Sequence, residues 1–204
     1  ISGEGDFNIG VFSRLEFQKG QHLVIGAVRV LRDRNVPAKL YVVGDVMYED
    51  YKADLVRRVE EARLSEHVSF KGFLTQPVLA MMSLDALVLP SRNEAFGLVL
   101  IEAMRCGVAV LGVNAGGVPE IIDDGETGLL FDWDKPSQLA DRLEYLFRNP
   151  AVKESLAKKG KQKADTHFDS DTHFKKLELL FADVIAGERM KIVPAHQIPL
   201  VNQA

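Results

Sequence analysis

Short apolar segments and longer amphipathic segments alternate along most of this chain. The apolar segments are rich in β-branched residues and are flanked by glycine or polar residues, which is typical of buried strands. Six of them are predicted to be strands, at residues 8–13, 38–44, 67–73, 85–91, 108–113 and 127–131. The amphipathic segments between them are predicted to be helices, at residues 20–33, 49–62, 76–83, 97–107 and 118–123.

Strands that are apolar on both faces and separated by helices indicate a parallel sheet covered on both sides. We therefore expect one α/β domain, a doubly wound Rossmann-like fold with a sheet of about six strands and helices on both faces. Three more helices are predicted after the last strand, at residues 136–147, 151–163 and 171–185. The expected organisation is a flexible lead-in at residues 1–8, the domain at residues 9–186, and a C-terminal tail at residues 187–204 that lacks periodicity.

Composition excludes several classes of protein. The 204 residues carry a formal net charge of −4, so the chain as a whole offers no basic surface for nucleic acid. No apolar run is long enough to span a membrane, and no charged-then-apolar leader precedes the first strand. Cys106 is the only cysteine, which rules out an internal disulfide and a cysteine metal site. A cytoplasmic protein fits these features best.

Polar and glycine residues concentrate where the predicted strands end. In an open parallel sheet, ligands bind in the crevice at the carboxyl ends of the strands. The segments that leave those ends are RLEFQKG (14–20), GDVMYED (44–50), GFLTQP (72–77), SRNEAFG (91–97) and NAGGVPE (114–120). This edge of the sheet is therefore the expected functional site.

Two glutamates lie in or near the most apolar helix, Glu94 before it and Glu102 inside it. A carboxylate in such an apolar run is costly to keep ionised unless something binds it. Gly97 can turn the chain into the helix, which would leave the N–H groups of Phe96, Gly97 and Leu98 free to bind an anion. Carboxylates beside an anion site suit a ligand that has both hydroxyls and phosphates, such as a sugar nucleotide.

The glutamates also have simpler explanations. Glu102 can pair with Arg105 or with Arg92, and the spacing alone favours neither reading. Glu94, in a loop, can simply be solvated.

The loop after the first strand adds two cations, Arg14 and Lys19. A guanidinium fork and a mobile ammonium together can neutralise a diphosphate. Taken alone, Arg14 is more simply explained as a partner of Glu16. Next to an anion site on a neighbouring strand, both cations gain a role, because a leaving diphosphate needs positive charge around it.

Other features argue against competing chemistries. The five histidines show no metal-ligand spacing, so we expect no metal. A nicotinamide-dependent dehydrogenase would need a G-x-G-x-x-G turn after the first strand, which is absent. A glycosidase with two carboxylates would have no use for an anion site.

The order of these segments resembles the C-terminal domain of the group 1 retaining glycosyltransferases, which is one half of the GT-B fold. The resemblance covers residues 9–185, and the motifs that carry it are RLEFQKG, VVGD, VSFKGF, ALVLPSRNEAFGLVLIEAMRCGVAV, NAGGVPEII and DGETGLLF. Glu94 and Glu102, with seven residues between them, match the paired-glutamate signature of that family.

The resemblance implies a nucleotide diphosphate sugar as the donor substrate, with no cofactor. Arg14 and Lys19 would hold the diphosphate, Glu94 would meet hydroxyls of the transferred hexose-type sugar, and these three would be the catalytic groups. Glu102 would bind the ribose hydroxyls. The other expected contacts are the backbone of Phe96, Gly97 and Leu98 with phosphate or sugar, and Gly44, Asp45, Phe73 and Leu74 with the base.

Two departures from the family matter. Ser13 stands where the family often has glycine, next to Arg14. A first domain, which would supply the acceptor site and any membrane contact, is missing from the chain, so we expect the chain alone to bind nucleotide and catalyse nothing. The alternative is a nucleotide-binding or interaction module that keeps the fold without catalysis.

Overall fold

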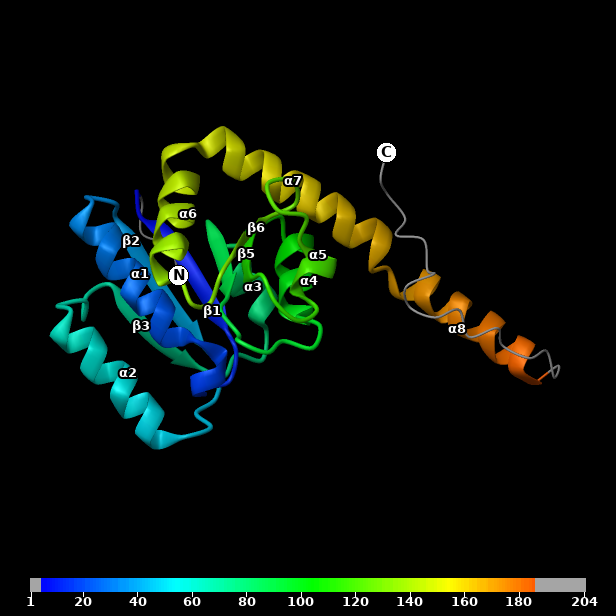
Figure 1. The fold of residues 1–204 in the computed structure, drawn as a ribbon, viewed down its shortest axis with the longest axis horizontal. Helices are drawn as coiled ribbons and strands as arrows, with labels where there is room; N and C mark the ends of the chain where they lie inside the picture. The colour runs from blue at the N-terminus through cyan, green and yellow to red at the C-terminus, as the bar shows by residue number, and fades with distance from the viewer. Residues whose placement is uncertain (1–4, 186–204) are drawn as a thin grey trace. The chain divides into compact units, whose positions relative to one another are not determined.

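A computed structural model describes residues 5–185 and shows a six-stranded parallel sheet (Figure 1). The strand order is β3-β2-β1-β4-β5-β6, which confirms the predicted doubly wound α/β fold. The strands are β1 (Phe7–Phe12), β2 (Ala38–Val43), β3 (Val68–Gly72), β4 (Ala86–Leu89), β5 (Ala109–Val113) and β6 (Leu129–Phe131).

Helices cover both faces of the sheet. On one face α1 packs against α2 and α6, and on the other α4 packs against α3 and α7 (Figure 1). The helices are α1 (Gln21–Asp33), α2 (Glu49–Glu61), α3 (Pro77–Met81), α4 (Leu98–Arg105), α5 (Val118–Ile121), α6 (Pro136–Arg148), α7 (Pro150–His167) and α8 (Ser170–Ile185), with a 3-10 turn η1 (Phe17–Lys19) before α1.

The core follows from the apolar strands. All residues of β1, β4 and β5 are buried, and the side chains of Ile9, Leu87 and Leu111 are fully buried. Each fully buried aliphatic side chain stabilises the fold by about 1.5–3 kcal/mol. A sheet buried on both faces leaves only its edges and strand ends open to solvent, which directs ligand binding to the strand ends.

The boundaries differ from those expected. β1 begins at Phe7, inside the predicted lead-in, because Phe7 is buried and its N–H bonds the Pro37 carbonyl at 2.9 Å. The compact unit ends at His167, and the described residues 168–185, which include α8, belong to a second unit. The predicted tail at residues 187–204 lies outside the described residues. None of the described helices is both long and apolar enough to cross a membrane.

The last strand is among those that are shorter than predicted. β6 begins at Leu129 rather than at residue 127. The Thr127 hydroxyl accepts a hydrogen bond from the Asp123 N–H at 2.9 Å, and Gly125 N–H bonds the Gly128 carbonyl at 2.9 Å. These turn contacts occupy the residues just before the strand.

Candidate functional site

A cleft of about 510 Å³ opens at the carboxyl ends of β1 and β2, facing α3 and α4. This cleft lies at the switch point of the sheet. Between β1 and β4 the strand order reverses, because successive strands are added on one side of β1 up to β3 and on the other side from β4 to β6. The residues that line it are Phe12, Ser13, Arg14, Val43, Gly44, Asp45, Phe73, Leu74, Pro77, Met81, Leu98, Val99 and Glu102.

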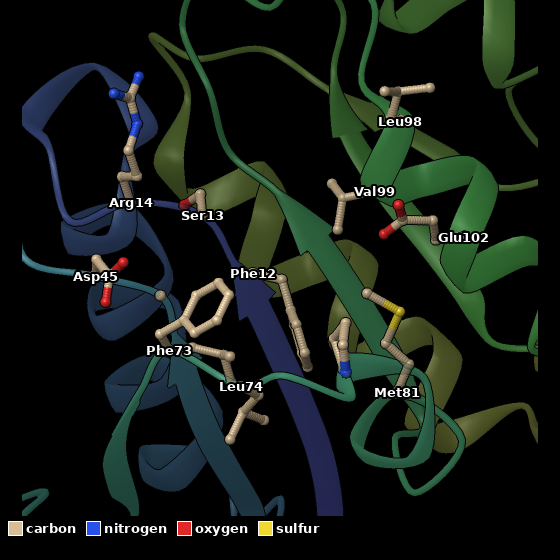
Figure 2. Close-up of a pocket in the computed structure, with 13 residues that line it drawn as sticks. Phe12, Ser13, Arg14, Asp45, Phe73, Leu74, Met81, Leu98, Val99 and Glu102 are labelled. Carbon is tan, nitrogen blue, oxygen red and sulfur yellow. The ribbon is translucent and has the colours of Figure 1, made fainter.

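The charged side chains stand on opposite sides of this cleft. Figure 2 shows Arg14 and Asp45 on one side and Glu102, with Leu98, on the other. Buried Phe12 lies between them. An apolar cleft with a few charged groups at its margins is typical of a small-molecule site.

Seven of the eleven predicted site residues line the cleft, namely Arg14, Gly44, Asp45, Phe73, Leu74, Leu98 and Glu102. The other four, Lys19, Glu94, Phe96 and Gly97, do not line it and lie in the adjoining loops after β1 and β4. The cleft therefore brings together Arg14 and Glu102, while Lys19 and Glu94 form a separate pair.

Neighbouring strand ends hold the loop that carries Arg14. Ser13 N–H bonds the Val43 carbonyl at 2.9 Å, and Leu15 N–H bonds the Asp45 carbonyl at 2.8 Å. Gly44 has φ +141°, and a Cβ there would lie 2.1 Å from the Ser13 carbonyl oxygen. Only glycine permits this approach, so Gly44 shapes the cleft through the backbone.

The Arg14 guanidinium is loosely held. Its side chain is 60% exposed, and its contacts are a 3.9 Å ion pair with Glu16 and a 3.9 Å contact with the Met47 sulfur. An exposed pair at that distance contributes at most about 1 kcal/mol. The expected ion pair with Glu16 therefore forms but is weak, and the Arg14 guanidinium remains available to an anion.

Lys19 and Glu94 lie next to one another in the loops beside the cleft. Their side chains form a 3.0 Å ion pair and are 23% and 18% exposed. The two loops are also joined through the backbone, where Arg92 N–H bonds the Gln18 carbonyl at 2.8 Å. In this arrangement the ammonium and the carboxylate have fixed positions next to the cleft.

A pair of glycines supports the loop of Glu94. A Cβ at Gly116 would lie 2.2 Å from the Glu94 carbonyl oxygen, and one at Gly117 would lie 2.3 Å from that of Ala95. Gly117 N–H also bonds the Glu94 carbonyl at 2.9 Å. The glycines therefore let two loops of the protein meet, which is the structural role that such pairs most often have.

Glu102 is exposed, so its position in an apolar run does not carry the expected burial cost. α4 buries Leu100, Ile101 and Met104 and turns Glu102 outward. Arg105, one of its expected partners, pairs instead with Asp165 at 3.7 Å. Within residues 5–185, the Glu102 carboxylate makes no hydrogen bond or ion pair.

Gly97 has φ +95° and precedes the first turn of α4, as expected for a turn from strand to helix. No described side chain caps this turn. The first N–H groups of a helix have no partner within the helix, so they suit an anion.

Periodicity missed six of the lining residues, Phe12, Ser13, Val43, Pro77, Met81 and Val99. Most are apolar residues at the ends of strands and helices, where sequence does not separate a cleft wall from the core. Ser13 had a signal, because it precedes Arg14 in a segment that leaves a strand end.

An aromatic group supports the start of α1. The rings of Phe17 and His22 stack with centroids 4.8 Å apart, and His22 Nδ1 lies 2.9 Å from the Tyr51 hydroxyl. Burial lowers the pKa of His22 and raises the pKa of Tyr51 to about 12, so both are neutral at pH 7. In the part of the chain that the structure describes, no group of three or more histidine, cysteine or acidic side chains could hold a metal ion.

Solved structures define the class of protein. Anabaena HepE in complex with UDP-glucose superposes with a TM-score of 0.83 and 28% identity, covering 87% of this chain and 49% of HepE. The C-terminal domain of LpcC from Francisella tularensis, a glycosyl transferase group 1 family protein, superposes with a TM-score of 0.75 and 30% identity, covering 81% of this chain and 88% of that domain structure. The fold is the Rossmann-like half of a GT-B glycosyltransferase.

Sequence relatives define the family. Residues 2–163 match the family described as "Glycosyl transferases group 1". D-inositol 3-phosphate glycosyltransferase of Paenarthrobacter aurescens is 33% identical over 169 residues, 80% of this chain and 40% of the relative. Glycogen synthase of Mycobacterium tuberculosis is 29% identical over 191 residues, 94% of this chain and 45% of the relative. The chain belongs to the group 1 glycosyl transferases and spans less than half the length of these curated relatives.

Proposed function

We propose that this chain is the donor-binding half of a retaining glycosyltransferase that transfers a hexose-type sugar from a nucleotide diphosphate sugar. The observation that carries the proposal is the cleft at the sheet's switch point, with Arg14 on one side and Glu102 on the other. The similarity of the chain to HepE, whose structure is known with UDP-glucose, supports a nucleotide diphosphate sugar as the ligand.

Each charged group has a role in the proposed reaction. The Arg14 guanidinium binds the diphosphate, and Lys19 adds positive charge as the leaving group departs. Glu94, paired with Lys19 at 3.0 Å, accepts hydrogen bonds from the sugar hydroxyls and orients the sugar for attack from the face that the diphosphate leaves. Glu102 accepts hydrogen bonds from the ribose hydroxyls.

The apolar part of the cleft is proposed to hold the base. Phe73 and Leu74 follow β3, and Met81 ends α3. The proposal assigns no metal to the site, since Arg14, Lys19 and the start of α4 already supply positive charge. The acceptor and its binding site are assigned to the other half of the GT-B fold.

Isothermal titration calorimetry with UDP and GDP tests the proposal directly. We expect one of them to bind with a dissociation constant between micromolar and millimolar, and the chain alone to transfer no sugar. Arg14→Ala should weaken that binding, because it removes the diphosphate ligand. No heat of binding from either nucleotide at millimolar concentration would contradict the proposed function.

A further inference from the structure

Gln21 is a fully buried polar residue beside the cleft that none of the proposed roles uses. It is the first residue of α1 and follows Gly20, whose φ of +72° turns the chain sharply. A Cβ at Gly20 would lie 2.2 Å from the Pro90 carbonyl oxygen, so the start of α1 is fixed against the end of β4. The backbone of Gln21, from which its side chain extends, is therefore fixed in position.

The Gln21 amide acts only as a donor. Nε2 donates to the Arg14 carbonyl oxygen at 2.7 Å and to Ser13 Oγ at 3.0 Å. A carbonyl oxygen only accepts, so the amide nitrogen must face this loop, and both of its hydrogens are used. Oε1 is buried and has no hydrogen-bond partner among the described residues. Burying an amide oxygen without a hydrogen-bond partner costs free energy. The two bonds that Nε2 donates must offset this cost, which indicates that they are important to the structure of the loop.

These two bonds determine what Ser13 can do. Ser13 Oγ accepts from Gln21, so its own hydrogen is left to donate, and no described residue receives it. Ser13 lines the cleft next to Arg14. Ser13 and Arg14 therefore present two hydrogen-bond donors to the cleft, a hydroxyl and a guanidinium.

The Arg14 backbone is held from both sides. The end of β2 and the loop after it bond the flanking residues, through Ser13 N–H to Val43 and Leu15 N–H to Asp45, and Gln21 bonds the Arg14 carbonyl itself. The guanidinium has only 3.9 Å contacts of its own. Its direction is therefore set mainly by the backbone, and Gln21 is the only described side chain outside the loop that holds that backbone.

We propose that Gln21 is a positioning residue for diphosphate binding, and that the Ser13 hydroxyl it orients is an additional phosphate ligand. This inference rests on the proposed function for its ligand, a nucleoside diphosphate. Gln21 fixes the Arg14 carbonyl and leaves the Ser13 hydrogen free for a phosphate oxygen. Ser13 thus adds a donor that a glycine at this position would lack.

The test compares UDP binding in variants of this chain. Gln21→Met keeps the length of the side chain and removes both donated bonds, so we expect the UDP dissociation constant to rise about tenfold. Ser13→Ala should also raise it about tenfold, since it removes one hydrogen bond to a charged ligand. The double variant Gln21→Met/Arg14→Ala should have a UDP dissociation constant within twofold of that of the double variant Arg14→Ala/Ser13→Ala. This is expected because Gln21 acts on UDP binding through Arg14 and Ser13.

The matched control is Val24→Ala, a fully buried residue one turn further along α1. It should leave UDP affinity within twofold of the unmodified chain even though it destabilises the fold. Equal losses of UDP affinity in Gln21→Met and Val24→Ala would show a general effect of stability and overturn the inference. Unchanged affinity in both Gln21→Met and Ser13→Ala would overturn it as well.

Hydrogen exchange of the unliganded chain separates this inference from the proposed function. The Leu15 amide, which bonds Asp45, should exchange faster in Gln21→Met than in Val24→Ala at matched stability. Faster exchange supports the anchoring role even if the chain binds neither UDP nor GDP; equal exchange refutes it even if UDP binds. If Gln21→Met does not fold, Gln21→Asn, which retains the donor on a shorter side chain, is measured in the same way.

Discussion

Glu102 lines the cleft with an exposed carboxylate, while Leu100, Ile101 and Met104 of the same helix are buried. An ionised carboxylate accepts hydrogen bonds and donates none, so the ligand groups that suit it are donors such as ribose hydroxyls. Because the side chain is exposed, it contributes little to the stability of the fold. Ligand binding and stability are therefore separable at this position.

Glu102→Gln keeps the shape of the side chain and removes its charge. We expect the UDP dissociation constant to rise about tenfold, because a hydrogen bond to a charged acceptor is stronger than one to a neutral amide. The free energy of unfolding should change by less than about 0.5 kcal/mol, as is usual for an exposed position. Calorimetry and urea denaturation measure the two quantities.

The control is Glu66→Gln, an exposed glutamate between α2 and β3, which should alter neither quantity. If Glu102→Gln binds UDP as tightly as the unmodified chain does, Glu102 is not the ribose ligand.

The loops after β4 and β5 depend on each other. Gly117 N–H bonds the Glu94 carbonyl at 2.9 Å, and a side chain at Gly117 would collide with the Ala95 carbonyl. Gly117 has φ −79°, which any residue can adopt, so the constraint at this position is steric. A change in the β5 loop should therefore displace Glu94 without touching it.

Gly117→Ala is expected to destabilise the chain by about 1–3 kcal/mol, as overpacking usually does, and to weaken UDP binding through the displaced loop. Gly26→Ala is the matched control, because Gly26 is an exposed helical residue with no atom within 4 Å of an added Cβ. It should stabilise the chain by about 0.5–1 kcal/mol and leave UDP affinity unchanged. Thermal unfolding together with calorimetry compares them; a Gly117→Ala chain as stable as Gly26→Ala would contradict the steric account.

Periodicity predicts the strands because burial on both faces makes them apolar throughout, as in β4 and β5. It does not predict where a strand yields to a turn, as at Thr127, whose hydroxyl bonds the Asp123 N–H. Periodicity also predicts that Glu102 is buried, because the residues around it are apolar. In the structure one side of α4 faces the cleft, and Glu102 lies on that side.

The charged residues of the site are predictable in kind but not in arrangement. Arg14 and Glu102 are visible because charged residues at strand ends and helix starts stand out from an apolar pattern. The contact between Lys19 and Glu94 depends on how the sheet places two distant segments, which no local pattern contains. Gln21 looks like an ordinary helical residue until its bonds to the Arg14 loop are seen.

The stability of the folded chain should depend on pH through two histidines. Burial, more than any nearby charge, lowers the pKa of both His22 and His67. For His22, Arg58 lowers the pKa further and Asp54 opposes it. A pKa that is lower in the folded state means that the unfolded chain binds more protons, so stability is full above about pH 6.5 and falls as the pH decreases below it.

His22→Gln should reduce the fall in melting temperature between about pH 7.5 and pH 5.5, because it removes one of the groups that gain a proton on unfolding. Thermal melts across this range measure the effect, and the exposed His167→Gln should leave the slope unchanged. The carboxyl pKa values of Asp54 and Glu144 are lowered by hydrogen bonds from Arg58 and Arg148, respectively, and affect stability only at more acidic pH. A slope identical in His22→Gln and the unmodified chain would show that His22 is not responsible.

The strand order also governs when the site can exist during synthesis. Lys19 and Glu94 are 75 residues apart, and the glycines that hold Glu94 follow in the loop after β5. A ribosome releases β1 and its Arg14 loop long before α3 and α4 have emerged to complete the other wall. A nascent chain that ends before Glu102 therefore lacks part of the cleft wall. Retention on immobilised nucleotide would separate chains with a complete cleft from shorter nascent chains.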